Sequence, residues 1–452
     1  MAGAWLILPW FLALLPAMHK AFGNSRQGFR AVATHFWCAC LSIARIFHVP
    51  DVHDLGFALL TGGIESPARS TVWAWMGRLK AAAVARFARL TESLTQWAGK
   101  AVCVSLDSHT VPCWTRKYAI PKGYHTCRNK YMKLEHLYYF YDLEGHCLLR
   151  LSATPGDQDL HRRMLPEIRR LMKDTGAARV RVLLDAAASK DEDLLLELMR
   201  EPGVEVLARA VRHRKYMRQW QAIPPSQWNA YEEPDETRGR PARLLGVGHT
   251  VTHLGPDETP VRTIVAREYH GRDQKECYHV LYANIAREHS IGLIQQFRLR
   301  QHHEQAYRVG VHDLNLDAIT HGYVKDSAPE DPDFDPSRIT LVGWLKALVF
   351  NALQAFKANL PDPFGRMQAG SLIRHFLLRP GSLYATADEL IVALDPFGSR
   401  EVLAKYVEHL NAHAHRIPWL GNRRLRVTFG DPAPNISGSE LASLLTPENT
   451  WC

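Results

Sequence analysis

A regular succession of strand and helix patterns between residues 101 and 211 restricts the fold of this chain more than any other feature. Residues 102–107 alternate between apolar side chains on one face and small or polar side chains on the other, which is typical of a half-buried strand. A hairpin of two strands around Gly145 follows, and then a helix, a strand, a helix and a last strand. Strands joined by helices in this order predict a mixed sheet flanked by helices, and therefore an α/β fold.

The rest of the chain is arranged around this sheet. We expect an N-terminal helical region at 1–100, the first part of the core at 101–211, a β-rich insertion at 212–284, the second part of the core with two long helices at 285–360, and a small α+β appendage at 361–452. The core elements follow one another as they do in ribonuclease-H-like folds. In such a sheet, functional side chains commonly lie at the carboxyl ends of the parallel strands.

The N-terminal region has two features that bear on possible partners. Its first 18 residues are strongly apolar, but Pro9 and Pro16 interrupt them and no Lys or Arg precedes them, so a buried helix is favoured over a signal peptide. No other segment is expected to reach membrane length, and no stable membrane association is expected. Residues 57–79 contain two helix patterns around Gly62 and Gly63, which fit either a helix-turn-helix or a simple helical hairpin.

The charge balance of the chain suggests a polyanionic partner. Lysine and arginine number 55 against 46 aspartates and glutamates, which gives a net charge of +9. Nucleic acid would match this excess, although solvated cations also serve solubility. The eight cysteines lack the paired spacings of a zinc site, and a disulfide framework is not expected at this length, so a reducing, cytoplasmic setting fits best.

Two aspartates follow the apolar part of predicted core strands. Asp107 ends the alternating strand that begins at Val102, and Asp185 ends the strand pattern RVRVLLD. If both strands are central and parallel, the two carboxylates emerge side by side at one end of the sheet. Two adjacent carboxylates repel each other unless a cation lies between them, and Mg²⁺ prefers such oxygen ligands.

The helix pattern at 293–314 places two charged residues, Arg300 and Glu304, within its apolar stripe. Burying an unpaired carboxylate costs on the order of several kcal/mol, so we expect Glu304 to face inward and to share a metal with Asp107 and Asp185. Arg300 would hold a phosphate beside that metal. Simpler interpretations stay open: the aspartates could cap strand ends, and Arg300 and Glu304 could form a solvated i,i+4 pair worth about 0.2–0.5 kcal/mol.

These residues together resemble the DDE transposases of bacterial insertion sequences, specifically the cut-and-paste group with a β-rich insertion before the last acid. That group has a signature of Tyr, two residues, Arg, three residues, Glu, six residues and Lys. Here Phe297, Arg300 and Glu304 stand at those spacings, with Phe297 in place of the tyrosine and Val311 in place of the lysine. The stretches VSLDSHTVP and VLLDAAAS resemble its two aspartate strands, and the likeness covers roughly residues 100–360.

The resemblance implies a magnesium-dependent transposase of the ribonuclease-H-like and retroviral-integrase superfamily. Asp107, Asp185 and Glu304 would be the catalytic residues and would hold two Mg²⁺ ions, for which Mn²⁺ is expected to substitute. The substrates would be double-stranded DNA, namely the terminal inverted repeats of a mobile element and its target. A homodimer on paired ends, in the bacterial cytoplasm and associated with the nucleoid, is expected.

Basic side chains near the predicted site are candidates for phosphate contacts. The segment RGRPAR at 238–243 resembles a hook for the minor groove, although a solvated loop fits equally well. The candidate DNA-binding residues are Arg300, Arg308, Arg116, Lys117, Lys130, Arg212, Arg214, Lys215, Arg238 and Arg240. Two other functions stay open: a transposase-derived DNA-binding protein without catalytic activity, and a ribonuclease-H-like nuclease.

Overall fold

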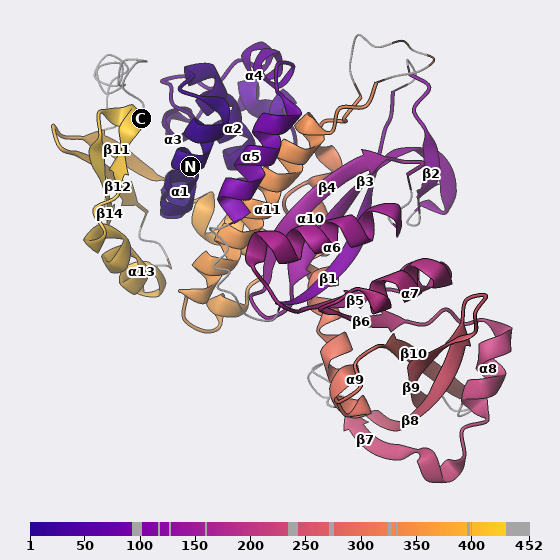
Figure 1. Ribbon diagram of the computed structural model, residues 1–452. Coiled ribbons are helices and arrows are strands. Elements are labelled where there is room, and N and C mark those ends of the chain that lie inside the picture. The colour runs from indigo at the N-terminus through magenta and orange to yellow at the C-terminus, as the bar shows by residue number, and fades with distance from the viewer. Residues whose placement is uncertain are drawn as a thin grey trace.

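The computed structural model describes residues 1–92, 102–115, 118–125, 128–158, 161–233, 243–270, 275–323, 328, 330, 333–395, 398 and 400–430 (Figure 1). Within these residues the protein has a large mixed sheet flanked by helices, as predicted. The order of strands in the sheet is β2-β3-β1-β5-β6-β10-β9-β8-β7. Strand β4 pairs with β3 on the side opposite to β1.

The part of the sheet that corresponds to the predicted core contains the six strands β1 to β6, of which β2 is a short strand paired with the start of β3. Its elements are β1 (Val102–Pro112), β2 (Lys122–His125), β3 (Lys130–Asp142), β4 (Cys147–Pro155), α6 (His161–Thr175), β5 (Val180–Leu184), the 3-10 turn η5 (Ala188–Lys190), α7 (Glu192–Arg200) and β6 (Val204–Arg209). Strand β1 pairs antiparallel with β3 and parallel with β5, and β5 pairs parallel with β6. The alternating strand, the hairpin β3–β4 and the two helix–strand units therefore occur in the predicted order.

The two faces of this sheet are covered by different helices. Val104 of β1 and Val182 of β5 belong to one buried cluster with Ile168 of α6 and Leu195 of α7. The opposite face contributes Leu183 and other side chains to a larger cluster, which includes helices from the N-terminal region and from the second part of the core. Both clusters follow from the period of two along each strand, which sends neighbouring side chains to opposite faces.

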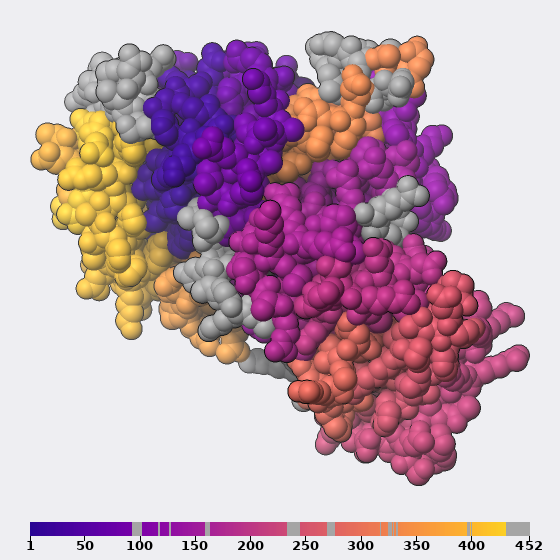
Figure 2. Space-filling view, viewed as in Figure 1, coloured from indigo at the N-terminus to yellow at the C-terminus, as the bar shows by residue number. Residues whose placement is uncertain are grey.

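Residues 212–284 extend the same sheet instead of forming a separate unit. Their elements are α8 (Arg214–Gln221), η6 (Pro225–Gln227), β7 (Asn229–Glu233), β8 (Arg243–Leu254), β9 (Thr259–His270) and β10 (Lys275–Ala283). Strand β10 pairs antiparallel with β6, which links the insertion to the core by backbone hydrogen bonds. Figure 2 shows this region as a lobe that projects from the rest of the molecule.

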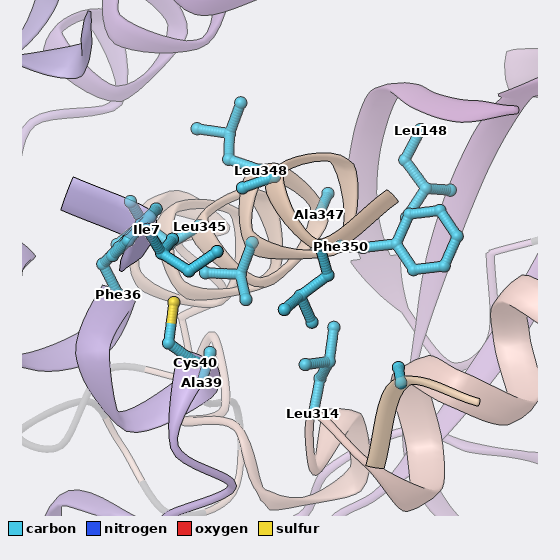
Figure 3. Packing of buried hydrophobic residues seen from close by; sticks show 14 of the residues in the cluster. Ile7, Phe36, Ala39, Cys40, Leu148, Leu314, Leu345, Ala347, Leu348 and Phe350 are labelled. Atoms are coloured by element: carbon cyan, nitrogen blue, oxygen red, sulfur yellow. The ribbon is translucent and has the colours of Figure 1, made fainter. Parts of the chain in front are cut away.

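The second part of the core contains the helix predicted at 293–314, but in two pieces. The elements here are α9 (Ser290–Arg298), α10 (Arg300–His312), η7 (Leu316–Ala318) and α11 (Ser337–Ala358). Helix α11 packs between the N-terminal helices and the sheet: Figure 3 shows Leu345 close to Ile7 and Phe36, and Phe350 beside Leu148. This helix therefore joins three regions of the chain in one core.

The N-terminal and C-terminal regions share that core. The N-terminal elements are η1 (Ala2–Ile7), α1 (Leu8–Phe22), α2 (Arg26–Cys40), η2 (Ile46–Asp51), α3 (Leu55–Leu60), α4 (Arg69–Met76) and α5 (Ala81–Glu92). The C-terminal elements are η8 (Phe364–Arg366), α12 (Ala369–Leu372), the π-helical turn η9 (Ile373–Leu377), β11 (Gly381–Ala385), β12 (Glu389–Leu394), α13 (Arg400–Ala412), β13 (Arg416–Ile417), η10 (Pro418–Leu420) and β14 (Arg423–Phe429). Tyr406 Oη donates to the carbonyl of Leu6 at 2.6 Å, and Trp419 Nε1 donates to the carbonyl of Leu59 at 2.8 Å.

Two N-terminal expectations are decided by these elements. Eight residues, 61–68, connect α3 to α4, whereas a helix-turn-helix has a turn of three or four residues, so this pair does not form a helix-turn-helix. Two stretches, Ala2–Phe22 and Ser337–Ala358, are long and apolar enough to cross a membrane, each with a mean hydropathy of 1.5. The prediction that only the N-terminal run has this length was wrong; both stretches lie mostly inside the protein.

Candidate active site

Asp107 lies on β1 at the level where this strand loses one of its two neighbours. Strand β1 stays paired with β3 as far as Pro112, but its pairing with β5 ends at Ser105, opposite Leu183. The prediction that Asp107 ends its strand was therefore wrong, because the hairpin β3–β4 keeps β1 extended for five more residues. One side of β1 is nevertheless open beside Asp107.

Asp185 follows the last residue of β5 and lies at the same level of the sheet. Continuing the β1–β5 register by two residues places Asp185 opposite Asp107, on strands separated by about 4.8 Å. Asp185 Oδ1 accepts the backbone N–H of Ala187 at 2.9 Å and of Ala188 at 3.3 Å. These hydrogen bonds fix the carboxylate against its own turn and leave Oδ2 without a hydrogen bond from any described residue.

Helix α10 brings Arg300 and Glu304 to this end of the sheet. Arg300 Nη2 lies 2.6 Å from Asp107 Oδ2, and Arg300 Nη1 lies 2.7 Å from Glu304 Oε1. One guanidinium therefore bridges the strand carboxylate and the helix carboxylate. The i,i+4 pair that the sequence left open as a simpler interpretation is present in this arrangement.

Glu304 does not face inward as expected. Its side chain is 61% exposed, whereas that of Arg300 is 11% exposed, and His303 and Ala306 are the fully buried residues of α10. The physical reason is a break before Arg300: Leu299 N–H bonds to Gln296 O, with the i→i+3 spacing of a 3-10 turn. Such a turn advances about 20° further per residue than an α-helix, so the buried stripe shifts past Glu304.

The electrostatic state of Asp107 reflects an excess of negative charge. Burial raises the pKa of Asp107 to about 6; the Arg300 guanidinium opposes this change, while the charges of Asp185 and Glu304 reinforce it. The N–H of Ser108, which donates to Asp107 Oδ1 at 2.8 Å, also stabilises the ionised form. A single arginine therefore does not compensate for the burial and for the two other carboxylates.

A group of aromatic residues and a histidine holds α10 against the sheet at this level. Tyr307 Oη donates to the backbone carbonyl of Asp107 at 2.9 Å. His303 is fully buried, lies 2.9 Å through Nδ1 from Ser105 Oγ, and stacks on both Tyr141 and Tyr307. The sequence analysis missed His303 and Ser105, although position 105 stands two residues before Asp107 and position 303 one residue before Glu304.

The donor atoms fit a hard divalent cation by chemistry but do not form a coordination group as placed. Asp107, Asp185 and Glu304 offer only carboxylate oxygens, which Mg²⁺ prefers, and their mutual repulsion would be relieved by a cation. Within the part of the chain that the structure describes, however, no three His, Cys, Asp or Glu side chains are arranged to hold a metal ion. Arg300 occupies the position between two of the carboxylates, so metal binding would require it to release them.

The predicted DNA-binding residues are dispersed over the molecule. Arg300 lies in the site, Arg308 is exposed on α10, and Lys130 is exposed at the start of β3. The three residues at α8 behave differently: Arg212 donates to the carbonyl of Tyr278 at 3.1 Å, Lys215 pairs with Glu258 at 3.4 Å, and Arg214 is exposed. Figure 1 shows α8 on the outer side of the β7–β10 lobe, far from α10. The other four, Arg116, Lys117, Arg238 and Arg240, lie outside the described residues.

A groove of 1170 Å³ beside α10 was not predicted from the sequence. It lies between α10, α11, the N-terminal helix α1 and the loop before α12. Arg308, Lys357 and Arg366 contribute basic side chains to its wall, and Asp142 and Asp313 contribute acidic ones. The groove depends on helices that are distant in the chain, and for this reason no local sequence pattern indicates it.

Comparison with known proteins adds little to this geometry. No protein-family model matches the chain, and a search of curated proteins finds no match. Among solved structures, the chain is similar to the piggyBac transposase in a synaptic complex with hairpin DNA, with 10% sequence identity over 78% of this chain and 70% of that chain. The TM-score is 0.39. A similarity of this size carries no argument about fold or function.

Proposed function

We propose that this chain is a DDE-type transposase, an enzyme that cuts and joins DNA at a carboxylate centre made by Asp107, Asp185 and Glu304. The observation that carries the proposal is the meeting of carboxylates from three regions of the chain: Asp107 and Asp185 lie opposite each other, and Arg300 bridges Asp107 and Glu304. Burial, reinforced by the charges of Asp185 and Glu304, raises the pKa of Asp107 to about 6. The order of strands and helices from β1 to β6, which is that of ribonuclease-H-like folds, supports it. The spacing of Phe297, Arg300 and Glu304 supports membership of the bacterial insertion-sequence group.

Each residue of the site has a distinct part in the proposed reaction. Bound divalent ions, Mg²⁺ or Mn²⁺, would supply the charge that activates an attacking hydroxyl and stabilises the leaving oxygen. Asp107 and Asp185 lie on neighbouring strands and Glu304 on a packed helix, which gives these ligands a rigid support. Arg300, once released from Asp107 and Glu304, would contact the phosphate under attack, since its planar guanidinium suits bidentate phosphate binding.

Double-stranded DNA is the proposed partner. The groove beside α10 presents Arg308, Lys357 and Arg366 next to the helix that carries Glu304, and phosphates are the groups that such side chains bind. We assign the terminal inverted repeats of a mobile element and a target DNA to the substrate, a homodimer to the active assembly, and the bacterial nucleoid to its location. These assignments follow from the proposed family.

A second candidate function is favoured by the placement of Arg300. The guanidinium bridges Asp107 and Glu304 at 2.6 and 2.7 Å, where an active enzyme would hold a cation. Val311 also stands where the family has a lysine. A transposase-derived protein that binds DNA without cutting it would have this arrangement permanently.

A cleavage assay on the full chain tests the proposal. Supercoiled DNA that carries the sequences flanking the gene is incubated with the protein and Mg²⁺ or Mn²⁺. We expect divalent-dependent nicks, double-strand breaks and strand-transfer products from the unmodified chain. Asp185→Asn should abolish all three while the protein still shifts the DNA in a gel, and Glu197→Gln, an exposed carboxylate on α7, serves as the matched control and should cut normally.

The outcomes separate the candidate functions. Binding without any cleavage by the unmodified chain supports the non-catalytic protein and overturns the proposal. Cleavage without joined products identifies a nuclease. Undiminished cleavage by Asp185→Asn removes the assigned site. A calorimetric titration with Mn²⁺, in which Asp107→Asn should weaken binding, reports on the metal site independently of DNA.

A further inference from the structure

Three large aromatic side chains are exposed in the region where strand β1 ends and β2 pairs with β3. Trp114 is 62% exposed, Tyr131 is 74% exposed and Tyr124 is 43% exposed. Tyr124 and Tyr131 are cross-strand partners with ring centroids 5.4 Å apart in an edge arrangement. We call Trp114, Tyr124 and Tyr131 the aromatic platform.

The platform is built on a fixed base. Strand β2 alternates strictly: Lys122 and Tyr124 are exposed, whereas Gly123 and His125 are buried. The outward direction of Tyr124 is therefore set by the strand. Lys133 lies under the platform, and its ammonium donates to the carbonyls of Thr115 and Tyr118. Below it, Cys113, Tyr118, Ile120 and Tyr323 form a small buried cluster of their own. Strand pairing and this buried cluster therefore fix the backbone from which Tyr124 and Tyr131 project.

The charged side chains of the segment that carries the platform have one sign. Between Cys113 and Leu134 the sequence contains six lysines and arginines and no aspartate or glutamate. The guanidinium of Arg128 lies 4.9 Å from the centre of the Trp114 ring, and Lys122 and Lys130 are exposed on the same strands. A partner of this surface should carry both negative charge and flat apolar faces.

Unpaired nucleic-acid strands combine these two properties. Their bases expose apolar faces that stack on aromatic side chains, and their phosphates bind basic ones. In a closed duplex the bases are stacked on one another, so exposed tyrosine and tryptophan rings gain little there. We propose that the aromatic platform binds unpaired DNA by stacking its bases on Trp114 and Tyr131, with Arg128 and Lys130 contacting the phosphates.

The proposal rests on the proposed function and adds the form of the DNA. Trp114 follows Asp107 by seven residues, the first five of them on β1, so the two lie at most about 24 Å apart. A strand separated from its complement near the carboxylate centre could therefore reach the platform. The platform would hold the bases of such a strand while the phosphate under attack lies near Asp107.

Fluorescence anisotropy with the full chain tests the proposal. The probes are a short labelled single-stranded oligodeoxynucleotide and the duplex of the same sequence and length. Trp114→Ala and Tyr131→Ala should each weaken single-strand binding about tenfold and leave duplex binding unchanged. Trp114→Phe, which keeps a stacking ring, should retain most of the affinity.

Two controls separate stacking from charge and from general damage. Phe47 is also exposed and has the Arg69 guanidinium 4.0 Å from its ring centre, but it lies in the N-terminal region, so Phe47→Ala should change neither affinity. Lys130→Ala should weaken the binding of both probes and reduce the salt dependence of that binding. A circular dichroism melt of each variant verifies that the fold is intact.

Either of two results would overturn the proposal: unchanged single-strand affinity in the Trp114→Ala, Tyr131→Ala double variant, or equal losses on both probes. Failure here is distinguishable from failure of the proposed function. If the chain cuts DNA but the double variant binds single strands normally, only the platform is refuted. If the chain never cuts DNA but single-strand binding depends on Trp114, the platform stands and the transposase proposal falls.

Discussion

In the part of the chain that the structure describes, two clusters each combine one arginine with three carboxylates, and they differ in how completely the negative charge is compensated. In the first, Arg150 of β4 is 3% exposed and contacts Glu92 of α5, Asp174 of α6 and, at 4.0 Å, Glu167 of α6. Burial lowers the pKa of Arg150, yet its hydrogen bonds and the charges of these carboxylates outweigh burial and hold the pKa above its ordinary value.

The second cluster has the same composition and the opposite balance. Arg300 contacts Asp107 and Glu304, and Asp185 lies one strand away. Here the charge of Asp107 is not fully compensated, because burial and the two other negative charges raise the pKa of Asp107 to about 6 in spite of Arg300. The first cluster joins α5 and α6 to the sheet and has no need of a ligand, whereas the second would gain from an additional cation. This difference is the physical basis for assigning function to one cluster only.

The largest expected effect is the loss of Arg150. Arg150→Ala removes the buried cation that Glu92, Asp174 and Glu167 share, although Arg170 stays 3.5 Å from Asp174. Removal of one partner from a buried ion pair costs about 3–5 kcal/mol. We expect a loss of that size in the free energy of unfolding by urea, whether or not Mg²⁺ is present. Arg300→Ala should lower the free energy of unfolding by less, because Glu304 is exposed and Asp107 can take up a proton. Equal losses would remove the contrast between the clusters.

Magnesium should stabilise the protein through the second cluster. If Mg²⁺ binds the folded chain alone, at 100 times its dissociation constant it adds about 2.7 kcal/mol of stability. Thermal unfolding with and without Mg²⁺ measures this shift, and Asp107→Asn should reduce it strongly. Asp174→Asn, a carboxylate of the first cluster, should leave the shift unchanged. A shift that survives Asp107→Asn would place the metal elsewhere.

Ionised Asp107 should weaken the fold at neutral pH. The pKa of this carboxyl is about 6 in the folded chain and about 3.9 when unfolded, so between these pH values the folded state binds more protons. Stability from this group therefore falls as the pH rises from about 4 to 6 and stays low above. Without divalent ions, Asp107→Asn should stabilise the chain by about 2–3 kcal/mol at pH 8 and by almost nothing at pH 4. A pH-independent difference would contradict the shift.

The sequence predicted more of the fold than of the site. The period of two in 102–107 and the order of elements up to 211 are local signals, and they predicted the core sheet correctly. The spacing of Arg300 and Glu304 also predicted that they meet on one helix. It did not predict the 3-10 turn at Leu299, since that turn depends on tertiary packing, and so it gave Glu304 the wrong degree of exposure.

The remaining details of the site depend on contacts between distant segments, which no local pattern reports. Tyr307 was one of the apolar-stripe positions in the sequence, and packing alone would have explained it. In the structure its hydroxyl reaches the backbone of Asp107, 200 residues earlier in the chain. His303 likewise meets Ser105 on β1. Both contacts fix α10 relative to β1, and each requires the complete fold.

The smallest expected effect comes from this hydroxyl. Tyr307→Phe keeps the ring stacked on His303 and removes the 2.9 Å hydrogen bond to the carbonyl of Asp107. The loss of stability should be about 0.5–1.5 kcal/mol. If the bond also fixes Glu304 relative to Asp107, Mn²⁺ affinity should fall in calorimetric titration, whereas Thr91→Val, which removes the buried hydroxyl that Trp344 Nε1 contacts at 2.7 Å, should leave that affinity unchanged. Equal Mn²⁺ affinities in the two variants would show that Tyr307 serves packing alone, and the position of α10 would then be set by its buried side chains.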